Sequence, residues 1–161
     1  MFKIFPVGLT TGRTMTPVYE NLLKIEHQSI GLFAKTTFAQ LDEILEDSSI
    51  TTNFAAEINN NLLCKFKGGH AGFIGIEVQV PNPFAEAERH RQNILQAGSL
   101  DVQLLGIGVN SHVGFNEPGS KTNSIYRVTK LAKSTIERNS YNPSMRAITL
   151  GIADILAVKK I

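Results

Sequence analysis

A short apolar run that ends in glycine and leads into a cluster of polar residues constrains the fold of this chain more than any other feature. The run extends from about Val102 to Ile107 and is typical of a strand buried in a parallel sheet. Polar side chains follow it closely: Asn110, His112, Asn116 and Glu117. Open α/β sheets bind ligands at the carboxyl ends of their strands, so the pattern predicts an α/β fold and the place of its chemistry.

The rest of the chain alternates between strand-like and helix-like segments. Strands are predicted over about 3–10, 32–38, 73–80, 102–107 and 126–131, and helices over 50–66, 84–97 and 134–138. The pair Thr16-Pro17 predicts another helix, with Thr16 as its N-cap. Asp42 and Glu43 are expected in a polar loop. The alternation predicts one domain over residues 1–161, with a Rossmann-like, doubly wound, mostly parallel sheet.

Composition narrows the class of protein. A chain of 161 residues with a hydrophobic fraction of 42% can bury a core. The net charge of +2 is small and dispersed, so we expect no nucleic-acid partner. We find no signal-peptide pattern and no apolar stretch of about 20 residues, so we expect a cytoplasmic protein without membrane association. The single cysteine, Cys64, favours a reducing compartment and is interpreted as a structural residue beside Leu62 and Leu63.

Two parts of the sequence are candidates for chemistry. His112 and Glu117 form a candidate proton-transfer unit, because histidine exchanges protons near neutral pH and a carboxylate nearby can hold its tautomer. The loop formed by Thr11, Gly12, Arg13 and Thr14 follows the first strand and precedes a helix N-terminus, where backbone N–H groups favour an anion such as phosphate. A simple polar turn explains this loop equally well.

Other ligand classes find less support in the sequence. Gly106-Ile107-Gly108 resembles the start of a dinucleotide-binding loop, but Ser111 replaces the third glycine and no helix pattern begins there. His27, His70 and His90 are interpreted as solvated, and no metal-ligand spacing connects them.

The segment from Gly106 to Gly119, with the order Asn110-Ser111-His112 followed by Asn116-Glu117-Pro118, resembles the signature of the glucosamine-6-phosphate deaminase (isomerase) family, which includes galactosamine-6-phosphate relatives. Residues 8–19, 37–43 and 147–152 resemble further family segments in the same order. The related 6-phosphogluconolactonases share a glycine-rich loop with histidine but lack the Asn-Glu-Pro that follows here. The resemblance covers most of the chain.

The resemblance implies a deaminating isomerisation of a hexosamine 6-phosphate to a ketohexose 6-phosphate and ammonia. It implies that Asp42 is the base that moves a proton between carbons 1 and 2, and that His112 assists ring opening, supported by Glu117 and Asn110. Thr11, Gly12, Arg13 and Thr14 are then expected to hold the substrate phosphate. Such a reaction needs no metal and no redox cofactor. Family members often carry aspartate where this chain has Asn110.

The chain also departs from the family pattern. Members are typically longer at both ends, and Tyr141 stands near a position where the family commonly places a phosphate-binding arginine. Arg13 and Arg127 are candidates to compensate. We therefore expect weakened phosphate binding and a sheet that lacks its outer strands, which favours a homo-oligomer.

Three functions stay open at this point. The first is the deaminase, with glucosamine and galactosamine 6-phosphates undecided between them. The second is a non-catalytic sugar-phosphate-binding remnant of the family, and the third is a 6-phosphogluconolactonase-like hydrolase.

Overall fold

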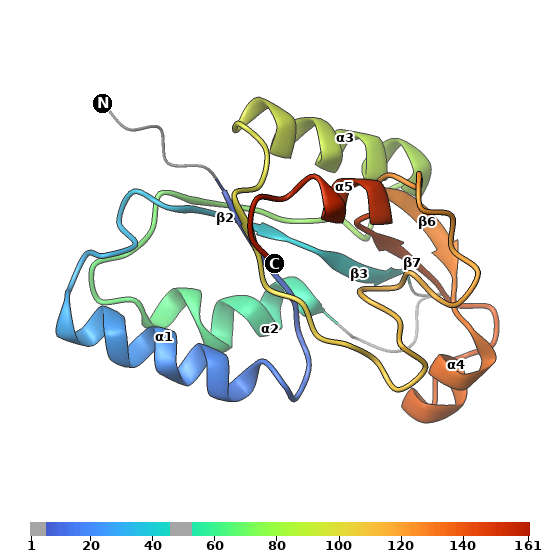
Figure 1. Cartoon of the computed structure of the whole chain (residues 1–161), viewed down its shortest axis with the longest axis horizontal. Helices are drawn as coiled ribbons and strands as arrows, with labels where there is room; N and C mark the ends of the chain where they lie inside the picture. Colours follow the sequence, from blue (N-terminus) through green and yellow to red (C-terminus); the bar gives the residue numbers. More distant parts are fainter. Residues whose placement is uncertain (1–5, 46–52) are drawn as a thin grey trace.

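The computed structural model of the chain describes residues 6–45 and 53–161 (Figure 1). The first residues of the strand predicted over 3–10, and of the helix predicted over 50–66, lie outside the described residues. Within the described ranges, no helix is long and apolar enough to span a membrane.

A parallel sheet forms the first half of the fold. Its strands are β1 (Val7–Leu9), β2 (Thr37–Gln40), β4 (Gly72–Ile74) and β5 (Val102–Gln103), in the spatial order β4-β2-β1-β5. The connections carry α1 (Thr16–Gln28), α2 (Phe54–Asn61), a 3-10 turn at Leu63–Lys65, and α3 (Pro83–Gln96). Parallel neighbours need such crossover connections, because a tight hairpin cannot join them.

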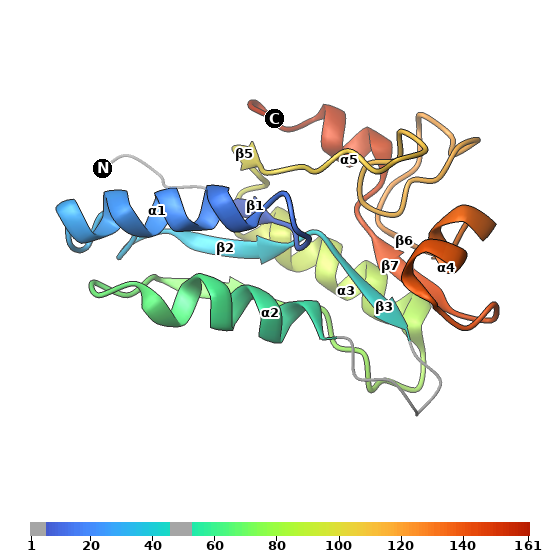
Figure 2. The ribbon, with the colours of Figure 1, turned by 90° about the horizontal axis from the view of Figure 1, so that it is seen from below.

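Helices cover both faces of this sheet (Figures 1 and 2). Neighbouring residues of β2 point to opposite faces, as the two-residue repeat of a strand requires. Phe38 packs in the cluster that contains residues of α1 and α2, whereas Ala39 packs in the cluster that contains Ala87 and Ile94 of α3. The predicted Rossmann-like, doubly wound α/β architecture is therefore confirmed.

The second half of the described fold is an antiparallel sheet, which the sequence patterns did not indicate. It contains β3 (Asp42–Leu45), β7 (Arg146–Thr149) and β6 (Arg127–Lys130), in the order β3-β7-β6. The chain passes between the sheets at Leu41, whose N–H donates to Leu9 O at 2.9 Å and whose carbonyl accepts from Leu150 N at 3.0 Å. Two short helices, α4 (Lys133–Asn139) and α5 (Ile152–Leu156), flank the ends of β6 and β7.

Several local predictions are confirmed. Helix α3 covers the predicted range 84–97 to within a residue, and its first turn is capped by the side chain of Asn82. Strand β6 and helix α4 lie within one residue or so of the predicted ranges 126–131 and 134–138.

Other local predictions are wrong. Asp42 and Glu43 are not in a polar loop, because they pair with Thr149 and Ile148 across a buried ladder. The segment 32–35 forms turns, so that strand begins only at Thr37. The ladders predicted over 73–80 and 102–107 end at residues 74 and 103. Helix α1 has Met15 as its N-cap, with Thr16 as its first residue.

Among the histidines, His90 corrects the prediction of a solvated side chain. Its ring is fully buried, with Nδ1 3.1 Å from Gly75 O and Nε2 2.9 Å from Gln40 O. His90 lies on the face of α3 that packs on the sheet, so its ring nitrogens contact these carbonyl groups in place of water. His27 is exposed as predicted, and His70 is partly buried. Cys64 is exposed, whereas its neighbours Leu62 and Leu63 are buried.

Candidate functional site

A cavity of about 270 Å³ lies beyond the carboxyl ends of β1 and β2. Thr11 and Gly12 line it from the loop after β1, Asp42 from β3, and His112 from the loop that follows β5. The remaining lining residues come from α2, from the loop that carries His112, and from α4 with the residues after it: Phe54, Glu57, Gly114, Phe115, Thr135, Asn139 and Tyr141. The topology thus brings together three segments that the sequence singled out separately.

Asp42 is the most deeply placed carboxyl group of this cavity. It is the first residue of β3 and is 5% exposed. Burial, and then the nearby charge of Glu43, raise the pKa of Asp42 to about 8. A carboxyl group with such a pKa can both take up and release a proton near neutral pH.

The loop that carries His112 approaches Asp42 closely at Gly114. This glycine has φ +56°, and a Cβ there would lie 2.8 Å from Thr149 Oγ1 and 3.4 Å from Asp42 Oδ2. Gly108 is equally constrained, because a Cβ on it would lie 2.3 Å from His112 Nε2. The glycines of this segment therefore make room for the two candidate catalytic side chains.

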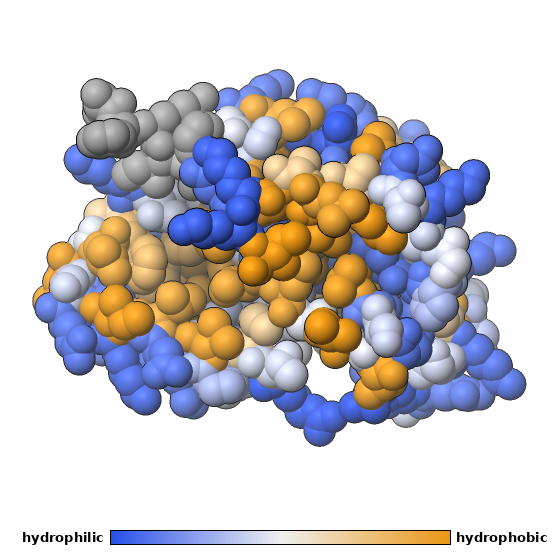
Figure 3. Space-filling model, viewed as in Figure 1, coloured by the Kyte–Doolittle hydropathy of each residue, from blue (hydrophilic) through white to orange (hydrophobic). Residues whose placement is uncertain are grey.

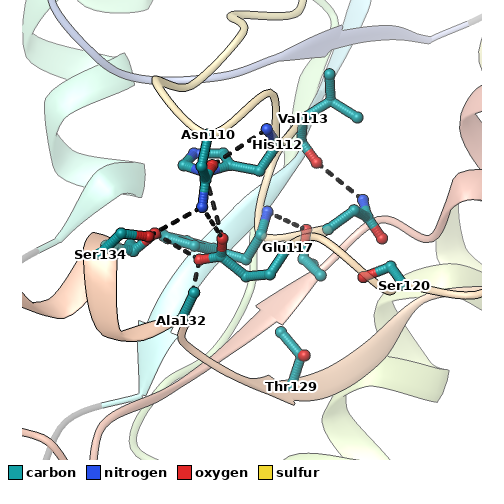
Figure 4. A network of polar contacts seen from close by, with 12 residues as sticks. Asn110, His112, Val113, Glu117, Ser120, Thr129, Ala132 and Ser134 are labelled. Atoms are coloured by element: carbon teal, nitrogen blue, oxygen red, sulfur yellow. Dashed lines mark hydrogen bonds and ion pairs between the residues drawn. The ribbon is translucent and has the colours of Figure 1, made fainter.

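His112 is held by a chain of hydrogen bonds (Figure 4). Its Nδ1 lies 2.6 Å from Asn110 Oδ1 and 3.4 Å from Glu117 Oε2. The Asn110 amide donates through Nδ2 to Glu117 Oε2 at 2.9 Å and to Ser134 Oγ at 3.1 Å. Because the amide nitrogen is engaged by the carboxylate, its oxygen must face His112 and accept from Nδ1–H. This assigned tautomer leaves Nε2 as the nitrogen that can exchange a proton.

Glu117 anchors this chain of hydrogen bonds to α4. Its Oε1 accepts from Thr135 Oγ1 at 2.6 Å and from Ala132 N at 3.2 Å. Burial alone would raise the pKa of Glu117, but the hydrogen bonds from Thr135, Asn110 and Ala132, together with His112, hold it below its usual value. Glu117 therefore stays ionised at neutral pH behind His112.

The predicted phosphate loop is only partly in the cavity. Gly12 adopts φ +109° and its carbonyl accepts from Met15 N at 2.9 Å, which turns the chain into α1. Thr11 and Gly12 line the cavity, whereas Arg13 and Thr14 are exposed and do not line it. The structure thus divides the predicted set into two residues at the cavity and two on its outside.

The wall of the cavity contains more acidic than basic side chains. Among its lining residues in the described part of the chain are Asp42, Glu57 and His112, but no arginine or lysine. Tyr141, near which the resemblance to the family leads us to expect an arginine, lines the cavity. Arg127 is not a replacement, because it donates to Asn116 Oδ1 at 2.9 Å and to Ser120 Oγ at 3.2 Å and lines a different cavity.

Some residues of the site were not found from the sequence. Glu57 and Phe54 lie on α2, and Thr135 lies on α4, in segments whose local patterns indicate helices and no site residue. Their place in the cavity depends on how the two sheets pack, so no local signal identifies them. Over residues 6–45 and 53–161, no group of His, Cys, Asp and Glu side chains is arranged to hold a metal ion.

Comparison with known proteins agrees with this geometry. The chain is 32% identical to a glucosamine-6-phosphate deaminase of Staphylococcus epidermidis, over 96% of this chain and 67% of that protein. It is 33% identical to a glucosamine-6-phosphate deaminase of Staphylococcus aureus, over 65% of its length. The chain belongs to the glucosamine-6-phosphate deaminase family.

The solved structures that this chain resembles include a member of the NagB superfamily. A monomeric glucosamine-6-phosphate deaminase matches with a TM-score of 0.82 and 30% identity, over 96% of this chain and 67% of that one. A 6-phosphogluconolactonase from Thermotoga maritima matches with a TM-score of 0.70 at 19% identity, which shows a shared fold. No family model matches the sequence. The chain spans about two thirds of the length of these relatives.

Proposed function

We propose that this chain catalyses the deaminating isomerisation of glucosamine 6-phosphate to a ketohexose 6-phosphate and ammonia. The observation that carries the proposal is the cavity shared by Asp42, His112 and the loop residues Thr11 and Gly12, in a member of this family. The relatives are named for glucosamine 6-phosphate, and this favours it over galactosamine 6-phosphate.

Asp42 is the proposed base. The reaction requires that the proton on carbon 2 of the open-chain sugar move to carbon 1, which leaves an imine at carbon 2. Water then adds to carbon 2, the carbon–nitrogen bond breaks, and the ketose and ammonia are formed. The raised pKa of about 8 gives the Asp42 carboxylate enough basicity for this transfer, and its burial excludes water that would compete for the proton.

His112 is proposed to open the sugar ring. With Nδ1–H donated to Asn110, the unprotonated Nε2 is available to take the proton from the hydroxyl group on carbon 1 and then to give it to the ring oxygen as the carbon–oxygen bond of the ring breaks. The ionised Glu117 supports this step, because it accepts from Asn110 and stabilises positive charge on the imidazole.

The substrate phosphate is proposed to bind at Thr11 and Gly12, next to the N-terminal turn of α1, with Arg13 and Thr14 on the outer side of the same loop. Backbone N–H groups at a helix start favour such an anion. The cavity wall offers no lysine or arginine among the described residues, which favours weak phosphate binding.

The absence of lysine and arginine from the described lining residues supports the second candidate, a sugar-phosphate-binding protein without turnover.

We further propose a cytoplasmic location, which the single cysteine supports. Association into a homo-oligomer stays a prediction, and the relative of known structure is described as monomeric.

Ammonia release separates these candidates. The folded chain is incubated with glucosamine 6-phosphate, galactosamine 6-phosphate or 6-phosphogluconolactone, and ammonia and lactone hydrolysis are followed. We expect ammonia from glucosamine 6-phosphate and its loss in Asp42→Asn. Binding without release of ammonia, seen by calorimetry, would favour the non-catalytic protein, and lactone hydrolysis alone would favour the hydrolase.

A further inference from the structure

The side chain of Glu43 joins two elements that form different walls of the Asp42 cavity. Its Oε1 lies 3.1 Å from Phe54 N and its Oε2 lies 3.1 Å from Ala55 N, the first two backbone donors of α2. Its Oε1 also accepts from Ile44 N at 3.1 Å, on the edge of β3 that does not pair with β7. The carboxylate thus ties β3, which bears Asp42, to the first turn of α2, which supplies Phe54 and Glu57 to the cavity.

A second contact runs through Gln40 to the backbone of Asp42. Gln40 Nε2 donates to Glu43 Oε2 and to Asp42 O, both at 2.8 Å. Gln40 Oε1 accepts from Ile76 N at 3.0 Å, so the amide orientation is fixed. Both Gln40 and Glu43 are 1% exposed, and such a buried, fully paired group tolerates little rearrangement.

We propose, on the basis of the proposed deaminase function, that Glu43 is a positioning residue: its carboxylate fixes Asp42 relative to the α2 wall of the cavity and keeps a second negative charge beside it.

When Glu43 is ionised, its charge acts on the proton affinity of Asp42. Burial raises the pKa of Glu43, and its hydrogen bonds from Phe54, Gln40, Ala55 and Ile44 oppose this rise and favour the charged form. After burial, the charge of Glu43 is the cause that raises the pKa of Asp42. Other titratable groups face Asp42 from the neighbouring elements: Tyr19 of α1, Glu57 of α2, His112, Tyr126 before β6, and Tyr141 after α4. If Glu43 loses its charge, Asp42 ionises at a lower pH, and burial keeps part of the shift.

Two variants separate charge from geometry. Glu43→Gln keeps the length and removes the charge, so the acid limb of the kcat/KM profile for glucosamine 6-phosphate should move down by about one pH unit. Glu43→Asp keeps the charge but shortens the reach to Phe54 and Ala55, so kcat should fall about 10-fold or more while the acid limb stays in place.

The matched control is Glu26→Gln. Glu26 is also fully buried and accepts three backbone hydrogen bonds, from Gly31, Lys67 and Gly68, but it lies at the far end of α1 from the cavity. This variant should lower stability and leave the position of the acid limb unchanged. A merely structural role for Glu43 would make Glu43→Gln behave in the same way.

A measurement without turnover distinguishes failure of this inference from failure of the proposed function. Urea unfolding is followed from pH 4 to 9 for the parent, Asp42→Asn, Glu43→Gln and the double variant. The difference in the free energy of unfolding between Asp42→Asn and the chain with Asp42 should grow with pH and then level off. With Glu43→Gln in both chains, it should level off at a lower pH. An unchanged plateau, or a Glu43→Asp variant with parental kcat, would overturn the proposal. If Glu43→Gln does not fold, Glu43→Asp alone decides.

Discussion

The raised pKa of Asp42 suits it to proton transfer but lowers the stability of the fold above acidic pH. Its pKa rises from 3.8 to about 8 on folding, because the buried carboxylate loses water and lies beside Glu43. Below pH 3.8 both the folded and unfolded chains carry the proton on Asp42. Between pH 3.8 and 8 only the unfolded chain releases it, so the folded state loses stability as the pH rises through this window.

Replacing Asp42 by Asn should remove this loss. We expect the free energy of unfolding of Asp42→Asn, relative to the parent, to increase by at most about 1.4 kcal/mol per pH unit from pH 4 to 8. Urea unfolding at each pH measures the difference. A difference that is constant over the whole range would show that Asp42 titrates in the folded chain as it does in water.

Asn110 provides a second test at this scale. Its carbonyl oxygen accepts from His112 Nδ1, and its amide nitrogen donates to Glu117. Asn110→Leu removes the acceptor that sets the tautomer of His112, so kcat should fall by a factor of about 100. Asn110→Asp keeps an oxygen acceptor, and it should retain most of the activity. Equal losses in both variants would contradict the proposed role of the side-chain oxygen.

At the scale of elements, segments with local end signals could be predicted from the sequence. Helix α3 lies between Pro83 and Gly98, and the side chain of Asn82 accepts from Phe84 N and Ala85 N at its start. The division of the strands into two sheets could not be predicted. It depends on Leu41, whose two backbone hydrogen bonds go to residues 32 and 109 positions away, and local patterns contain no such information.

The candidate site also has residues that the local sequence identifies and residues that it does not. His112 and Glu117 stood out because polar residues in a glycine-rich strand end have little packing reason to be there. Asp42 is identified only through the family resemblance, because by themselves Asp42 and Glu43, after a strand, resemble a polar loop. Asp42 pairs with β7, and it is buried in part by the loop before Phe115. Both segments lie far away in the sequence.

The junction between α3, α5 and β6 is a test of how elements are joined. Asp154 of α5 accepts from Tyr126 N at 2.6 Å and from Arg91 Nε at 3.3 Å. Asp154→Ala leaves a partly buried donor unpaired and should lower the free energy of unfolding by about 1–3 kcal/mol. Asp154→Asn keeps an acceptor and should cost less. Urea unfolding that ranks the two variants equally would show that the junction does not depend on these hydrogen bonds.

At the scale of the whole molecule, apolar side chains gather across the middle of the face shown in Figure 3, over α5 and the chain between β5 and β6. Ile107, Val109 and Leu156 are each more than 60% exposed. Apolar patches of this kind mark surfaces that other protein segments cover. Association of this chain with further copies stays a prediction, and the relative of known structure is described as monomeric.

The acidic character of the cavity predicts how phosphate affinity can be improved. Tyr141→Arg introduces a cation into a wall that contains Asp42 and Glu57. We expect KM for glucosamine 6-phosphate to fall about 10-fold, with little change in kcat, because the phosphate is the same in the ground and transition states. Unphosphorylated glucosamine is the matched control substrate, and its KM should not fall. A change in kcat alone would place Tyr141 away from the phosphate.

Deuterium labelling follows the proton that Asp42 is proposed to move from carbon 2 to carbon 1. Glucosamine 6-phosphate is converted in D₂O, and the ketose product is examined by NMR for deuterium at carbon 1. We expect the ketose made by the parent chain to carry deuterium at carbon 1, to the extent that the proton held by Asp42 exchanges with solvent before it is transferred, and we expect no ketose from a folded Asp42→Asn variant. Ketose and ammonia formed by Asp42→Asn at the parental rate, with the same labelling, would contradict this role of Asp42.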